Sequence, residues 1–137
     1  MSTEIKIFVV LLCITLIIDL IVINIFFKKN WEITIKNIQN ENMVIKMQYA
    51  LITYFLIPLG LLFFVYPRID KKSWIKSSLI FGFMFGIIAY GIFDFTNLSL
   101  FKKYPLKLAI IDTIWGGILC ASVVFICYYI LEIKKLF

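Results

Sequence analysis

Four long apolar runs constrain this chain more than any other feature of its sequence. They cover residues 7–27, 49–66, 79–95 and 108–130, and they occupy most of the chain. A hydrocarbon core about 30 Å thick needs about 20 residues of helix to cross it, so runs of this length predict membrane-spanning helices. The sequence therefore predicts an all-α polytopic membrane protein. Residues 1–137 are expected to form a single integral membrane domain, a bundle of four transmembrane helices.

Composition and charge agree with a membrane location. Hydrophobic residues make up 63% of the chain, against roughly half in soluble domains. The net charge of +6 comes from basic residues that flank the apolar runs, which indicates contacts with lipid headgroups rather than nucleic acid. Membrane lipids are therefore the expected partners. The chain has no histidine, which excludes His-based zinc sites and His-activated nucleophiles, and neither a cofactor nor a metal is expected.

The number of basic residues on each side does not decide the orientation in the membrane, so the prediction rests on their densest cluster. With four spans, both termini lie on the same side as the connection after the second run. The fourteen basic residues of the chain divide equally between the two sides. The densest cluster, Arg68 to Lys76, lies on that short second connection, and cytoplasmic loops are enriched in Lys and Arg. This favours cytoplasmic termini.

Two segments depart from regular spanning helix. The connection after the first run carries Trp31, Ile35 and Ile38 at positions i, i+4 and i+7 among polar residues. That pattern is typical of a short helix lying in the membrane interface, with a lid as the alternative.

Pro58 lies inside the second run and lacks a backbone donor, so a kink is expected near it.

The third and fourth runs each carry a ridge of small and polar residues at helical spacing. Small residues let two membrane helices approach closely, and a short connection makes these two runs antiparallel neighbours. We therefore expect the ridges to face each other. They consist of Gly82, Gly86, Tyr90 and Asp94 in the third run, and Ala109, Asp112, Gly116 and Cys120 in the fourth.

Three aspartates, Asp19, Asp94 and Asp112, are expected in the same half of the membrane. An ionised carboxylate at the centre of a spanning helix costs about 2.5 to 3.5 kcal/mol, and such groups usually face the bundle interior or a wet cavity. Trp115 lies three residues after Asp112, so its indole N–H could donate to a carboxylate or carbonyl one turn away. These groups predict a ligand-binding or ion-binding site. Its candidate residues are Asp19, Tyr90, Asp94, Asn97, Asp112 and Trp115.

A structural interpretation of the same residues stays open. Asp94, Thr96 and Asn97 are short polar side chains that could end the third helix by bonding local backbone. Asp112 could lie at headgroup depth. The lysines within residues 102–107 could neutralise the outer carboxylates.

The C-terminal half of the chain resembles a known family. YGIFDFTNLSL (residues 90–100) and YPLKLAIIDTIWGGILCA (residues 104–121) resemble the signature of small predicted membrane proteins catalogued only as a domain of unknown function. The family's usual tryptophan before the proline is Tyr104 here, and Asp19 also matches. The resemblance implies a four-helix membrane protein and no assigned activity. The matching residues are Tyr90, Asp94, Thr96, Asn97, Tyr104, Pro105, Leu106, Asp112, Trp115 and Gly116.

Two function classes follow from these observations. In the first, the intramembrane polar site binds or transports a lipid headgroup or a small cationic ligand. A homodimer would then enlarge the space available for transport, and proton exchange at Asp19 or Asp112 would drive release. In the second, the protein is a non-catalytic scaffold or assembly subunit whose aspartates hold helices together. A lipid-modifying enzyme with paired carboxylates as acid and base is the least supported, because the chain has no convincing nucleophile or cofactor motif.

Overall fold

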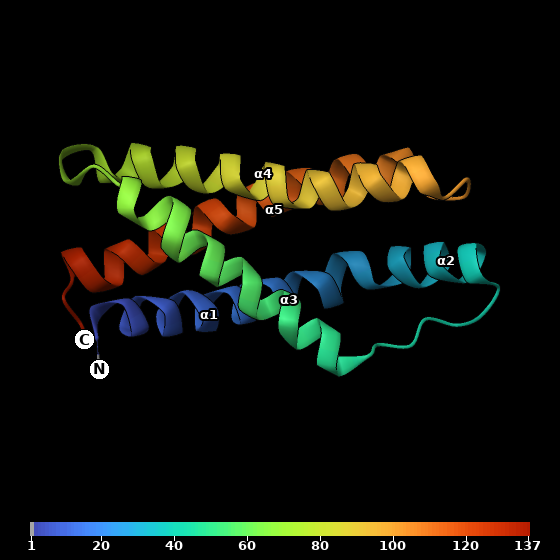
Figure 1. The fold of residues 1–137 in the computed structure, drawn as a ribbon, viewed down its shortest axis with the longest axis horizontal. Helices are drawn as coiled ribbons and strands as arrows, with labels where there is room; N and C mark the ends of the chain where they lie inside the picture. The colour runs from blue at the N-terminus through green and yellow to red at the C-terminus, as the bar shows by residue number, and fades with distance from the viewer. Residues whose placement is uncertain (1) are drawn as a thin grey trace.

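Four long helical segments form an elongated bundle in the computed structural model, which describes residues 2–137 (Figure 1). All four are long and apolar enough to cross a membrane, which confirms the all-α, four-helix prediction. Their bounds are Thr3–Gln39, Met47–Arg68, Lys71–Leu100 and Leu106–Ile133.

The first segment is longer than its apolar run. It consists of α1 (Thr3–Val22), a π-helical turn η1 (Ile23–Phe27) and α2 (Lys28–Gln39), which follow one another without a break. At 1.5 Å per residue these 37 residues extend about 55 Å, which exceeds the thickness of a hydrocarbon core. Asn40 ends α2 in the left-handed conformation with φ of 61°, which asparagine tolerates.

The placement predicted for the segment around Trp31 is wrong. The segment is helical, but it continues α1 instead of lying apart in the interface. Trp31 and Ile38 pack with Tyr104 and Leu108 at the end of the bundle where the third and fourth segments are connected. Tertiary packing on neighbouring helices has taken the place of the membrane surface as the partner of this apolar face.

The second segment changes its helical type close to Pro58. It begins as α3 (Met47–Gly60), in which Pro58 is fully buried. It then continues as the π-helical η2 (Leu61–Val65) and the short η3 (Tyr66–Arg68). A wider helical turn therefore follows the proline directly, while the kink expected near Pro58 stays a prediction.

The third and fourth segments are closely packed antiparallel neighbours. A short turn, η4 (Lys71–Ser73), leads into α4 (Trp74–Leu100), and α5 (Leu106–Tyr128) continues as the π-helical η5 (Tyr129–Ile133). A Cβ atom added to Gly82 would lie 2.7 Å from Ala121 Cα, and one added to Gly86 would overlap the backbone of Gly116. The two ridges therefore face each other, as the sequence predicts.

The central core forms where α5 meets the first two segments. Leu11 of α1, Leu61 of η2 and Leu119 and Val123 of α5 are fully buried together. Both termini lie at the same end of the bundle (Figure 1), where the Lys6 ammonium donates to the Phe137 carbonyl. Most other large apolar side chains point outward, as expected for faces that contact lipid.

Candidate functional site

Asp19 joins three helices through its two carboxylate oxygens. Trp115 Nε1 of α5 donates to Oδ1 at 3.0 Å, and the Tyr54 hydroxyl of α3 donates to Oδ2 at 2.9 Å. The side chain is only 4% exposed. Each carboxylate oxygen has two lone pairs, so both keep an acceptor position after accepting these bonds.

Asp94 is fully buried and is bonded by two hydroxyl groups. The Tyr104 hydroxyl donates to Oδ1 at 2.6 Å, and Thr113 Oγ1 lies 3.4 Å from Oδ2. The Asn97 side chain reaches the same Tyr104 hydroxyl. Burial, together with the bond to Asp94, raises the pKa of the Tyr104 phenol above its usual range. The hydroxyl therefore keeps its proton at neutral pH and acts as a donor.

Asp112 has a different environment from the other two aspartates. Its carboxyl group lies beside that of Asp94, and two ionised carboxylates at close range repel each other. No hydroxyl, amide or indole group within residues 2–137 donates a hydrogen bond to Asp112. Asp112 is nevertheless only 7% exposed. It is a buried carboxyl group with acceptor positions left open.

Asp112 and Asp19 both line a cavity of about 420 Å³ between the helices. Hydroxyl groups of Thr53, Tyr54 and Tyr90 also line it, and no lysine or arginine of residues 2–137 does. Ile23 of the π-helical turn η1 also lines the cavity, and such turns often occur at functional sites. The remaining lining residues are Trp31, Ala50, Ile57, Ala89 and Phe93.

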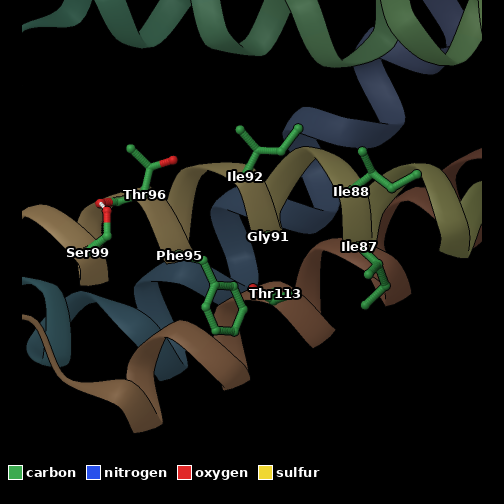
Figure 2. Close-up of a pocket in the computed structure, with 8 residues that line it drawn as sticks. All are labelled: Ile87, Ile88, Gly91, Ile92, Phe95, Thr96, Ser99 and Thr113. Carbon is green, nitrogen blue, oxygen red and sulfur yellow. Dashed lines mark hydrogen bonds between the residues drawn. The ribbon is translucent and has the colours of Figure 1, made fainter.

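A second hollow lies on the outer side of α4 and differs in chemistry. It measures about 590 Å³ and is a shallow, mostly apolar groove. Figure 2 shows Ile87 and Phe95 pointing from α4 toward α5, where Thr113 lies, while Ile88 and Ile92 point away. No candidate site residue lines this outer groove, whose apolar character suits contact with lipid tails.

The chain is related in sequence to a known family of membrane proteins. The model of a family described as predicted membrane protein (DUF2177) matches residues 4–129, which include every residue of the site. The chain belongs to this family. No curated protein and no solved structure matches the chain. The DUF2177 assignment confirms the resemblance and an integral membrane protein, and it supplies no activity, so the function is argued from the cavity.

The structure brings most of the predicted residues of this DUF2177 protein together. Asp19, Tyr90 and Asp112 line the cavity. Trp115 and Asp94 lie directly behind these residues, and Asn97 lies outside the cavity beside the Tyr104 hydroxyl.

Three details of the predicted arrangement differ in the structure. Trp115 donates to Asp19 on another helix, because its indole points across the bundle and not along α5. Asp94 does not end its helix, since α4 continues to Leu100. The lysines within residues 102–107 are exposed and do not neutralise Asp94. The hydroxyl groups of Tyr104 and Thr113 lie beside Asp94 instead.

Several residues of the site were missed by sequence reasoning. The sequence offered a reason to include Tyr54, because it is a polar aromatic residue inside an apolar run, one turn before Pro58. Tyr104 belongs to the family signature, but that signature did not predict that Tyr104 donates a hydrogen bond to Asp94. No sequence feature indicated Phe93 or Thr113, since their contacts depend on how the helices are rotated against each other.

Proposed function

We propose that the cavity binds an organic cation, either free or as the headgroup of a lipid. One observation carries this proposal: Asp19 and Asp112 line the cavity, while no basic side chain from the described residues 2–137 does. An ionised carboxylate inside a membrane is costly unless a partner neutralises it. The missing positive charge must therefore come from a proton or from a bound cation, and the cavity provides space for the latter.

The walls of the cavity favour an organic cation over a bare metal ion. Trp31, Tyr54, Tyr90 and Phe93 contribute aromatic rings, and ammonium groups bind to such faces with about 0.5 to 2 kcal/mol per contact. Metal ions such as Ca²⁺ prefer six to eight oxygen ligands. Within residues 2–137 no group of three or more His, Cys, Asp or Glu side chains is arranged to hold a metal ion.

Binding in this proposal needs a single copy of the chain. The residues that the proposal uses, Asp19, Tyr90 and Asp112, line a cavity within one chain. The homodimer remains a prediction that concerns transport, in which two cavities would act together. The cytoplasmic placement of the termini likewise remains a prediction.

Native mass spectrometry of the gently extracted protein tests the proposal. We expect wild type to retain a cationic molecule, and Asp112→Asn to lose it while keeping the same thermal unfolding midpoint. Loss of the carboxylate removes the charge that holds the cation. Glu41→Gln is the matched control, because Glu41 is an exposed carboxylate that does not line the cavity. An Asp112→Asn protein that retains the same molecule as wild type would contradict the proposal.

The structural alternative has its own supporting observation. Asp94 does not line the cavity and bonds Tyr104 and Thr113, so it links α4 to the following connection and to α5. In the same experiment we expect Asp94→Asn to lower the unfolding midpoint and to retain the ligand. A scaffold protein would show this behaviour for Asp112→Asn as well, with no specific molecule bound to wild type.

Acidification provides a second test, since protons compete with a cation for the same carboxylates. We expect the affinity for tetramethylammonium to fall as the pH is lowered from about 7 to about 3.5, through the range in which aspartate carboxylates take up protons. Tryptophan fluorescence can follow the binding, because Trp31 lines the cavity. An affinity that does not change over this range would show that the aspartates do not provide the binding charge.

A further inference from the structure

We infer that the occupant of the cavity is a lipid with an ammonium headgroup, which enters sideways from the bilayer between α3 and α4. This inference rests on the proposed function and names the source of the cation. The headgroup would lie against Asp19 and Asp112, and the acyl chains would leave through the opening between the two helices.

The packing of α3 leaves such an opening. α3 packs on α1, and its π-helical continuation η2 packs on α4, while α3 itself hardly contacts α4. The cavity lies in this space, with Ala50 and Tyr54 of α3 on one side and Ala89 and Phe93 of α4 on the other. In Figure 1, α3 crosses the bundle obliquely while α4 and α5 run along its length.

The rim of the opening faces lipid. Phe93 is 52% exposed although it lines the cavity, and Thr53 beside it is exposed as well. Around them Leu51 of α3 and Ile92 of α4 point outward as exposed apolar side chains. All of these residues lie within helices long and apolar enough to cross the membrane. The mouth of the cavity therefore meets acyl chains at membrane depth.

The polar end of the cavity provides a position for a charged headgroup. Asp112 is 7% exposed, and no hydroxyl, amide or indole group of residues 2–137 donates a hydrogen bond to it. Tyr90 places a hydroxyl and an aromatic face next to it. An ammonium group offers the charge and the donors that Asp112 lacks, and aromatic faces bind methylated ammonium groups too. An amphiphile fits this combination of a polar end and a lipid-facing mouth.

Two arms of one experiment separate a lipid from a free cation. In the first, native mass spectrometry compares phosphatidylethanolamine, phosphatidylcholine and phosphatidylglycerol of the same acyl chains, each added to the purified full chain. In the second, tryptophan fluorescence measures tetramethylammonium and ethanolamine without acyl chains. We expect a lipid with an ethanolamine or choline headgroup to be retained, phosphatidylglycerol to be lost, and the free cations to bind at least tenfold more weakly than the lipid.

Variants at the mouth test the route. Ala89→Phe fills the opening from α4, and Ala50→Phe fills it from α3 in case the first variant does not fold. We expect either variant to lose the retained lipid, because both positions line the cavity at the opening. Ile88→Phe is the matched control, because Ile88 neighbours Ala89 on the same helix but lines the outer groove (Figure 2).

Each outcome separates this inference from the proposed function. If free cations bind as tightly as the lipids and neither mouth variant changes lipid retention, the lipid route is wrong while cation binding stands. If phosphatidylglycerol is retained as well as the ammonium lipids, the headgroup assignment is wrong. If neither the lipids nor the free cations bind wild type, both the inference and the proposed function fail.

Discussion

At the scale of single residues, the bond from Tyr104 to Asp94 is the clearest stabilising contact of the site. The hydroxyl lies 2.6 Å from a carboxylate oxygen that is fully buried. Removing one partner leaves a buried polar group without its bond, at a cost of about 1 to 3 kcal/mol. We therefore expect Tyr104→Phe to lower the free energy of unfolding by that amount, measured by denaturant titration in mixed micelles.

Two controls identify the cause of this loss. Tyr49→Phe removes a hydroxyl from a side chain that is 60% exposed, and it should leave the stability unchanged. In an Asp94→Asn background, Tyr104→Phe should cost less than in wild type, because the charged acceptor is already gone. Equal costs in both backgrounds would mean that the Tyr104 hydroxyl stabilises the protein through a partner other than Asp94, since phenylalanine keeps the ring contact with Trp31 at 6.0 Å between centroids.

At the scale of helices, the close approach of α4 and α5 depends on the absence of side chains at their crossing. A Cβ atom at position 86 would overlap the backbone of Gly116, which cannot move without separating the helices. Overpacking of this kind typically costs about 1 to 3 kcal/mol. We expect Gly86→Ala to destabilise the protein by at least that much in the same unfolding assay.

Gly91 provides the comparison on the same helix. A Cβ atom there would lie 3.4 Å from Thr113 Cγ2, which is close to ordinary contact. Alanine is favoured over glycine in a helix by about 1 kcal/mol, so Gly91→Ala should be neutral or slightly stabilising. Similar losses for both variants would show that glycine is needed for helix flexibility and not for the crossing.

The element scale also shows what a sequence can predict. The spacing of Gly82, Gly86 and Gly116 predicted which faces of α4 and α5 meet, because small residues in register leave few other ways to pack. The length of the first segment was not predictable in this way. Polar residues 28–39 end the apolar run, but they do not end the helix, since α2 gains its packing partners from elements far away in the sequence.

At the scale of the whole molecule, the candidate site followed from the sequence only in outline. The three aspartates were expected in one half of the membrane because the topology alternates direction with each span. The sequence did not predict that Asp112 faces the cavity and Asp94 does not. That difference depends on how each helix is rotated about its axis, and the rotation depends on the complete set of packing contacts. The cavity is lined by residues of α1, η1, α2, α3, α4 and α5, so no single segment of the sequence predicted it.

The orientation of the bundle in the membrane gives the last prediction. Both termini and the connection between the second and third segments lie at one end of the molecule, while the connection between α4 and α5 lies at the other (Figure 1). The dense basic cluster at residues 68–76 is expected to stay in the cytoplasm, because Lys and Arg in short loops resist translocation. We expect a cysteine introduced as Lys103→Cys to react with a membrane-impermeant maleimide in intact bacterial cells that express the chain. A cysteine introduced as Lys72→Cys should react only after the cells are permeabilised.

The native cysteines make this labelling experiment direct. Cys120 and Cys127 are buried in the core, and Cys13 lies within the membrane-spanning α1. Wild type should therefore show little labelling and serve as the background. Both lysines that are replaced are exposed and lie outside the apolar runs, so neither change should disturb the bundle. Labelling of Lys72→Cys but not Lys103→Cys in intact cells would reverse the orientation. The mouth between α3 and α4 would still open into the bilayer, because its position depends on the helices and not on which side the termini occupy.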